Sequence, residues 1–464
     1  MENLFTMSKK IIVLGSLFFL FSCNQDEMIN NDLQKSVPSF DKKIKESGFA
    51  DNDMVMYWNE KTSTVLTGPF NPPTQARYFA MIQIAVHDAL NAIKPKYERF
   101  ALNQREKFAD PDAAVASAAY WVIKGTNVQG THPVDSWYNE SLATIPDGES
   151  KELGKTLGKQ AADAIIANRS TDNFAQANVD SPAPDGDDPG EYRSTLPFSL
   201  PGLPKIKALQ QWGTLMTPFA VLSNNQFRAS APYAVNSFNY ENDYNEVKTK
   251  GARVGHTRTT DETEIGVFWV ERSTIGWNRF ARNIIADKKL DAWKTARLFA
   301  LLHTAMIDGV SGCFEAKYYY FYWRPETAIR MGDDDDNNNT IGVVDWLPSY
   351  TEGPNLTNPA MNLYTPPIPD YPSAHANFGG AAAEILKLFF ETDNISVDQT
   401  SPTAPGVTRH YSRISQAARD NSLSRIYVGY HFRKACLAGE EQGKQIASYV
   451  FSHKFQESDK CEEF

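Results

Sequence analysis

The segment from Lys317 to Arg324 places two cations among aromatic residues, where a charge could bind an anion. The two residues are seven apart, so on a helix they share one face two turns apart. Cations in such apolar surroundings require an anionic or carboxylate partner. The alternative is that both side chains reach solvent and form structural salt bridges.

A second segment, Pro-Ser-Ala-His at 372–375, directly precedes a predicted helix. Ser373 is a natural N-cap, and the free N–H groups at a helix start favour an anion. His375 begins that predicted helix and has a side chain suited to acid–base chemistry. The alternative is an ordinary capped helix that carries an incidental histidine.

A third segment contains Ser424, Arg425 and His431. Alone, it also fits a core histidine beside a surface arginine. Taken with the other two segments, it completes a set of three cations and two imidazoles. Such a set suits a tetrahedral oxyanion, because arginine donates forked hydrogen bonds and lysine adds a point charge.

Helices must position these segments, because apolar residues recur every three to four positions along much of the chain. No stretch shows a convincing period of two. We therefore predict an all-α fold of two packed helical bundles, with an N-terminal helical region over 61–255 and a catalytic helical bundle over 256–455. The individual helices are predicted at 75–94, 112–123, 149–168, 260–284, 290–306, 317–330 with an interruption at Pro325, 375–390 and 422–451.

The N-terminus has the pattern of a bacterial lipoprotein signal. Lysines precede an apolar run at 11–21 that is too short to span a bilayer, and Leu-Phe-Ser-Cys follows. We predict a signal over 1–23 that is acylated at Cys23, and a flexible tether over 24–60. The alternative is an ordinary secretory signal with a chance cysteine. The predicted location is therefore the periplasm or cell surface, with the outer membrane favoured.

The formal net charge of −10 argues against a general nucleic-acid binder, which needs a basic surface. Membrane contact is expected through the lipid alone. The sequence sets neither the oligomeric state nor the membrane face, although a helical bundle of this size often forms a homodimer.

The three segments match, in order and spacing, the signature KxxxxxxRP, PSGH, SRxxxxxH of the superfamily that joins vanadium-dependent haloperoxidases and type-2 phosphatidic acid phosphatases. Over most of 60–452 the chain resembles the bacterial haloperoxidases. It departs from the signature at Ala374, where glycine is usual, and at Ala435, where the phosphatases carry an aspartate that orients the histidine. Asp308 is our candidate to replace that aspartate, unless it is an ordinary helix-end acid.

The resemblance implies a vanadate cofactor and a reaction in which hydrogen peroxide oxidises a halide, most readily iodide or bromide, to hypohalous acid. His431 would bind the vanadium, His375 would be the general acid and base, and Lys317 would activate the peroxide. Ile368 would lie on the side where halide approaches. The residues that would cradle the oxyanion are Lys317, Arg324, Ser373, Ala374, Arg425 and His431.

Two other functions use the same residues. An acid phosphatase would use His431 as the nucleophile and His375 to protonate the leaving group. A lipid-anchored oxyanion-binding protein would need no acid or base, so His375 argues against it. The sequence determines neither the halide preference nor an organic acceptor, nor whether residual phosphatase activity exists.

Overall fold

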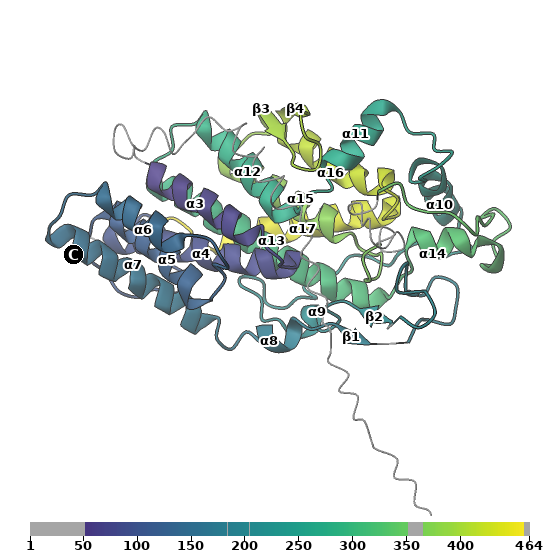
Figure 1. Cartoon of the computed structure of the whole chain (residues 1–464), viewed down its shortest axis with the longest axis horizontal. Coiled ribbons are helices and arrows are strands. Elements are labelled where there is room, and N and C mark those ends of the chain that lie inside the picture. Colours follow the sequence, from purple (N-terminus) through teal and green to yellow (C-terminus); the bar gives the residue numbers. More distant parts are fainter. Residues whose placement is uncertain (1–51, 183, 204, 351–364, 459–464) are drawn as a thin grey trace, which may run out of the picture. The chain divides into compact units, whose positions relative to one another are not determined.

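Helices dominate the computed structural model, which describes residues 52–182, 184–203, 205–350 and 365–458 (Figure 1). None of the helices within these ranges is long and apolar enough to cross a bilayer. In chain order the elements are α3 (Asp53–Leu66), α4 (Pro72–Ile93), α5 (Pro111–Gly125), α6 (Val134–Ala143), α7 (Glu149–Asn168), α8 (Phe174–Ala177), β1 (Ser181–Pro182), β2 (Ile206–Lys207), α9 (Trp212–Leu215), α10 (Phe238–Lys250), α11 (Thr260–Phe268), α12 (Ser273–Ala286), α13 (Ala292–Tyr320), α14 (Pro325–Arg330), η1 (Gly332–Asp334), α15 (Ala374–Phe390), β3 (Asn394–Thr400), β4 (Thr408–Arg413), α16 (Ile414–Tyr427) and α17 (Arg433–His453).

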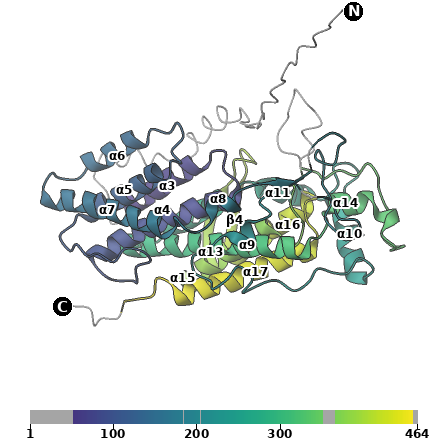
Figure 2. The same ribbon diagram turned by 90° about the horizontal axis from the view of Figure 1, so that it is seen from below.

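The 29-residue helix α13 contacts elements from both ends of the chain. It starts at the N-cap Asp291, whose side chain accepts a hydrogen bond from the Lys294 N–H. Helix α4, from the N-terminal part of the chain, packs along α13, and so do α15 and α17 from the C-terminal part of the chain (Figure 2). Because neighbours surround it, nearly every residue from position 295 onward is buried, which explains its apolar composition on all faces.

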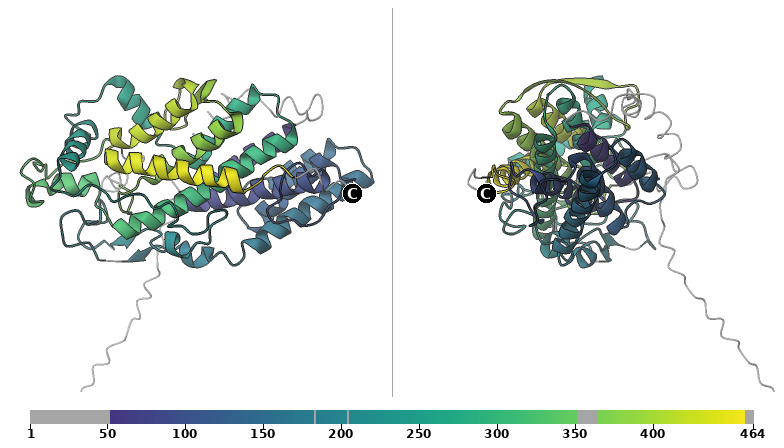
Figure 3. Two further views of the ribbon diagram at one scale, coloured as in Figure 1. Left: turned by 180° about the vertical axis from the view of Figure 1, so that it is seen from behind. Right: turned by 90° about the vertical axis from the view of Figure 1, so that its left-hand side faces the viewer.

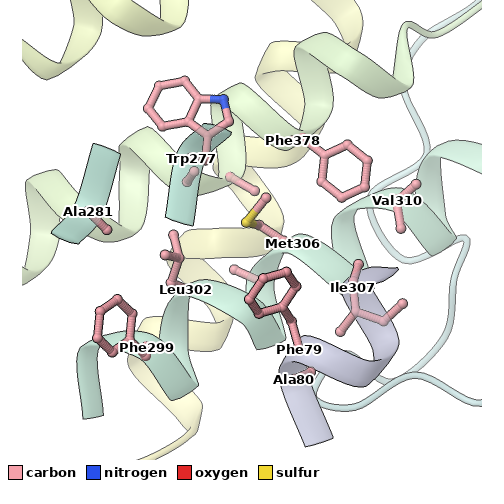
Figure 4. Packing of buried hydrophobic residues seen from close by; sticks show 14 of the residues in the cluster. Phe79, Ala80, Trp277, Ala281, Phe299, Leu302, Met306, Ile307, Val310 and Phe378 are labelled. Atoms are coloured by element: carbon pink, nitrogen blue, oxygen red, sulfur yellow. The ribbon is translucent and has the colours of Figure 1, made fainter. Parts of the chain in front are cut away.

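One apolar core joins these helices (Figure 4). Phe79 of α4, Trp277 of α12, Met306 of α13 and Phe378 of α15 point toward one another, and none is more than 2% exposed. At about 25 cal/mol per Å² of buried apolar surface, side chains of this size each stabilise the fold by roughly 1.5–3 kcal/mol. This core fixes α12, α13 and α15 relative to one another, and the candidate site residues are carried on these helices and beside them.

Helices α15 and α17 approach closely where glycine replaces a side chain (Figure 3). A Cβ on Gly439 would lie 2.2 Å from the Ser373 carbonyl oxygen, and one on Gly443 would lie 2.2 Å from the Asn377 carbonyl oxygen. Any larger residue would push the helices apart. The two glycines therefore hold the start of α15, which carries Ser373 and His375, against α17.

The predicted tether is wrong over 53–60, because these residues belong to α3. Trp58 is 1% exposed and Tyr57 is 5% exposed, so the helix is anchored by aromatic burial. The rest of the tether, the predicted signal over 1–23 and Cys23 lie outside the described residues and stay predictions, as does the division at 255/256.

Four predicted helices, at 260–284, 290–306, 317–330 and 422–451, are divided differently in the structure. The segment 260–284 forms two helices, α11 and α12, and the segment 422–451 spans α16 and α17. Helix α13 continues to Tyr320, so Lys317 ends one helix while Arg324 is the N-cap of the next, α14. The two cations therefore do not share one helical face, and the chain turn between them brings them together instead.

Two short antiparallel sheets were not predicted. Strands β1 and β2 pair over two residues each, and β3 pairs with β4 with an irregular register near Asn394 and Val397. Along β3 and β4 most side chains are exposed or half-buried. Such strands leave little apolar alternation in the sequence, so the pattern could not reveal them.

Candidate active site

Lys317 and Arg324 both converge on the chain segment that precedes α15. The Lys317 Nζ donates hydrogen bonds to the carbonyl oxygens of Pro369, at 2.7 Å, and Asp370, at 2.9 Å. The Arg324 Nε donates to the Ile368 carbonyl at 2.8 Å. The convergence is possible because α13 ends at Phe321, whose left-handed backbone (φ 50°) turns the chain back. Both cations are buried, with exposed fractions of 0% and 1%.

His431 lies in the turn between α16 and α17. Gly429 makes this turn with φ +82°, and a Cβ there would lie 2.6 Å from the Gly251 carbonyl oxygen, so glycine is required. The His431 Nε2 is 3.1 Å from the Arg324 Nη1, which also donates to the Tyr430 carbonyl at 2.9 Å. The turn thus delivers the imidazole to the cation pair.

Asp370 holds the other side of the same ring. The His431 Nδ1 is 2.7 Å from the Asp370 Oδ1. Burial, together with Arg324 and Lys317, holds the pKa of His431 well below its ordinary value, so the ring is neutral. A neutral ring that donates Nδ1–H to the carboxylate keeps its lone pair on Nε2, which is the arrangement of a metal-binding histidine.

Asp370 is the functional residue that the sequence interpretation missed. It is fully buried, and its carboxylate also accepts from the Phe432 N–H at the start of α17. Burial raises its pKa to about 7, although Arg324 and Lys317 lower it. The signal was present, because Asp370 is the acid five residues before His375 in a segment that already resembled the haloperoxidases. It supplies the carboxylate that Ala435 lacks.

The expectation that Asp308 orients His431 is wrong. Its carboxylate accepts three hydrogen bonds from the N–H groups of Phe219, Ala220 and Val221, at 2.7, 2.7 and 3.0 Å. Asp308 is fully buried and fastens the 219–221 segment to α13. Its role in this fold is structural, because both carboxylate oxygens are engaged there.

We predict that Asp308→Ala lowers the free energy of unfolding by about 3–5 kcal/mol, since three buried N–H groups lose their acceptor. Urea unfolding followed by circular dichroism measures this loss. Glu152→Ala, at an exposed position on α7, is the control and should change the value by less than about 0.5 kcal/mol. A loss below about 1 kcal/mol for Asp308→Ala would show that the three contacts are not formed.

The start of α15 supplies hydrogen-bond donors. The Ser373 Oγ accepts from the Ala376 N–H at 3.4 Å, and the Ser373 N–H donates to the Ala435 carbonyl at 2.9 Å. Ala374 is the first helical residue and has no positive φ, so alanine replaces the usual glycine without backbone strain. Its N–H belongs to the free donors of a helix start, which attract anions.

His375 has one engaged and one unengaged ring nitrogen. The Nδ1 is 2.9 Å from the Ser273 Oγ. The Nε2 is buried and has no hydrogen-bond partner among the described residues. Burial and the nearby Arg425 hold the pKa of His375 well below its ordinary value. A buried polar atom without a partner is uncommon in proteins, so this nitrogen indicates a place for a ligand.

Arg425 lies in the last turn of α16, 6% exposed, with its Cζ 5.0 Å from the Tyr430 ring centroid. It is close enough to lower the pKa of both His375 and His431, so it belongs to the same cluster. Ile368 is partly buried, and its carbonyl fixes Arg324. Its predicted position on the halide side stays a prediction.

Charged groups gather in the cluster. Its described residues include three buried cations, Lys317, Arg324 and Arg425, and one buried carboxylate, Asp370. Burial lowers the pKa of Lys317 to about 7, and repulsion from Arg324 adds to this effect. An anion among these groups would relieve the repulsion. The donors and the His431 Nε2 lone pair therefore fit a tetrahedral oxyanion whose central atom accepts a nitrogen ligand, as vanadium does.

The same elements match a known domain. Residues 297–459, which include every member of the cluster, match the family described as the VCPO second helical-bundle domain. These residues therefore form a helical bundle of that type, and the chain has the fold of the vanadium haloperoxidases.

Similar proteins match most of the length of this chain. The vanadium chloroperoxidase of Curvularia inaequalis is 24% identical over 504 residues, which take in 86% of this chain and 81% of the relative. A bacterial vanadium-dependent iodoperoxidase has a similar crystal structure, with a TM-score of 0.71, 23% identity, and coverage of 89% of this chain and 100% of that one. An apo-type bacterial vanadium-dependent chloroperoxidase gives a TM-score of 0.62 with 15% identity over 83% of this chain and 94% of that one. The predicted all-α haloperoxidase fold is thereby confirmed.

Five of the predicted site residues lie close together in the fold: Lys317, Arg324, His375, Arg425 and His431. The contacts of Lys317 and Arg324 run to 368–370 and 430–431, and the helix start at 373–375 follows directly. Asp308 lies with another segment. Ser273 and Asp370, which were not predicted, complete the surroundings of the two histidines.

Proposed function

We propose that this chain is a vanadate-dependent haloperoxidase that oxidises a halide with hydrogen peroxide to hypohalous acid. One observation carries the proposal: Asp370 holds the Nδ1 of His431 at 2.7 Å, while Nε2 keeps its lone pair beside Arg324. The relatives named above are haloperoxidases, which favours this reaction over hydrolysis.

Bound vanadate would supply a Lewis acid that activates peroxide while the vanadium keeps one oxidation state. His431 would bind it through Nε2. Lys317, Arg324 and Arg425 would neutralise its oxygens, and Ser373 with the Ala374 N–H would donate hydrogen bonds. Lys317 and Arg324 are buried and held by main-chain carbonyls, so they are positioned beside His431 before the anion binds, and the Arg324 Nη1 would give up its contact with the His431 Nε2.

His375 would move the proton. Converting hydrogen peroxide and a halide to hypohalous acid and water consumes one proton overall. The His375 ring is neutral, and its Nε2 has no hydrogen-bond partner among the described residues. The Nε2 can therefore accept a proton from peroxide and return it to the departing oxygen. Lys317, which a bound anion would keep protonated, would add positive charge where the peroxide is polarised.

Iodide is the easiest halide to oxidise, so we propose iodide activity as the minimum and bromide activity as the next. The relatives do not choose between halides, since they include chloroperoxidases and an iodoperoxidase. Ile368 is the residue that we propose on the halide side.

A direct assay tests the function. Purified protein is stripped of oxyanions, supplied with orthovanadate, and then given peroxide with iodide or bromide. Halogenation of an organic dye that requires vanadate supports the proposal. Hydrolysis of a phosphate ester that vanadate inhibits, without halogenation, would replace it with the acid phosphatase. If neither halogenation nor hydrolysis were detected, the protein would instead be interpreted as an oxyanion-binding protein.

Asp370→Asn is expected to weaken vanadate binding about 10–100-fold, because the carboxylate no longer orients and charges the ligand histidine. Equilibrium dialysis against orthovanadate measures the change. Asp243→Asn is the matched control, since Asp243 is also a buried acid but lies on α10 and accepts from the Lys434 N–H in the first turn of α17. If Asp370→Asn bound vanadate within twofold of the wild-type affinity, Asp370 would have no role in holding the ligand histidine.

A further inference from the structure

The two histidines of the site are held by different kinds of partner. His431 faces a carboxylate, Asp370, whereas the Nδ1 of His375 faces a hydroxyl, the Ser273 Oγ, at 2.9 Å. The main chain of Trp269 also hydrogen-bonds the His375 ring and raises its pKa against the effect of burial. This difference suits two different tasks for the two rings.

Ser273 lies on a rigid part of the fold. It is the first residue of α12 and is 5% exposed. The next residue, Thr274, donates its hydroxyl hydrogen to the Gln75 Oε1 at 2.8 Å, which ties α12 to α4. Trp269, which ends α11, donates from Nε1 to the Tyr411 hydroxyl at 2.9 Å. Neither partner of His375 can therefore shift without disturbing the core.

The partners also determine which ring nitrogen carries the proton. A main-chain group that raises the pKa of a histidine must be an acceptor, so Trp269 contributes its carbonyl oxygen. A carbonyl needs a protonated nitrogen opposite it. Because the Nε2 has no hydrogen-bond partner among the described residues, the protonated nitrogen is Nδ1. The lone pair then lies on Nε2.

We infer that Ser273 is a positioning residue, whose hydroxyl acts with the Trp269 carbonyl to hold His375 as the Nδ1–H tautomer with Nε2 as the proton acceptor of the site. The inference rests on the proposed function for its consequence in turnover. The main chain of His375 is fixed as well, because the Asn421 Nδ2 donates to its carbonyl at 3.1 Å. Neutral groups thus hold both the Nδ1 side of the ring and the main chain of His375.

The experiment compares wild type, Ser273→Ala and Ser273→Thr, first without vanadate. Long-range ¹H–¹⁵N correlation spectra of histidine-labelled protein report the tautomer directly, and His375→Gln identifies the signals. We expect Nδ1–H in wild type and Ser273→Thr, and a shift toward Nε2–H in Ser273→Ala. Thr274→Val, which removes the neighbouring buried hydroxyl, should leave the tautomer unchanged.

Turnover and binding are then measured on the same variants. Ser273→Ala should lower kcat about 10–100-fold, as expected for losing the partner that orients a functional histidine, and Ser273→Thr should restore most of it. Vanadate affinity should stay within about threefold of wild type, a change of under about 0.7 kcal/mol. A purely structural role would instead lower the stability and leave the tautomer unchanged.

An Nε2–H tautomer in wild type would overturn the inference, and so would a Ser273→Ala variant with the wild-type tautomer and kcat. The inference is supported if His375 is the Nδ1–H tautomer in wild type and not in Ser273→Ala, even if the protein shows no halogenation. That last result would count against the proposed function alone, so the two failures are distinguishable.

Discussion

Replacing His375 by alanine is expected to lower kcat for iodide oxidation by about 10²–10⁴-fold, the range typical of losing a general acid and base. The reason is geometric, because the buried Nε2 of His375 has no hydrogen-bond partner among the described residues, whereas the two ring nitrogens of His431 lie beside Asp370 and Arg324. Vanadate should still bind, since its proposed ligand is His431. Steady-state kinetics with saturating vanadate, alongside equilibrium dialysis, separates the two effects.

The control for His375→Ala is His410→Ala. His410 lies on β4, its side chain is 58% exposed, and its Nδ1 is 2.8 Å from Asp398. This replacement should leave kcat within about twofold of wild type. If His375→Ala kept more than a tenth of the wild-type kcat, another group would have to handle the proton.

Replacing His431 by alanine is expected to weaken vanadate binding by more than about 100-fold. Loss of a residue that only orients a metal ligand already costs 10–100-fold, so loss of the ligand itself costs more. The affinity for inorganic phosphate should fall far less, because phosphate contacts the same cationic side chains but forms no bond to the histidine nitrogen. The affinity for each anion is measured by equilibrium dialysis.

The comparison of the two anions separates a ligand role from a general electrostatic role. His431→Gln serves as the second variant, because its amide can still donate to Asp370 and so keeps the buried carboxylate partnered. An equal loss for vanadate and phosphate in both variants would show that His431 contributes packing or charge rather than a bond to the metal.

The pocket residues could be predicted because each stands beside a strong local signal. Ser373 precedes a helix with a free N-terminus, and Arg324 precedes Pro325, which suits the first helical position. Such signals depend on near neighbours in the sequence. They also survive an error in helix bounds, since Lys317 and Arg324 meet although they do not share a helix.

The partners of the histidines could not be predicted in the same way. Asp308 and Asp370 are both buried acids in apolar surroundings, and the sequence offers no measure of which one faces His431. The choice depends on how the turn at Gly429 aims the ring, which is a tertiary property. Ser273 is 102 residues from His375 and had no local signal that linked it to the site.

The helix break between α11 and α12 shows the limit of periodicity. Residues 269–272 contain neither proline nor glycine, and apolar residues continue across them, so 260–284 resembled one helix. At the break Trp269 and Glu271 are both buried, and Glu271 pairs with Arg279. Such tertiary contacts leave no mark in the periodicity, and helix propensity is only a weak preference.

The most direct test is a crystal structure of the protein with orthovanadate, using anomalous scattering to locate vanadium. We expect one vanadium within bonding distance of the His431 Nε2, with Asp370 still on Nδ1 and the side chains of Lys317, Arg324 and Arg425 around its oxygens. Vanadium bound elsewhere, or a His431 ring that turns Nε2 away from it, would contradict the account.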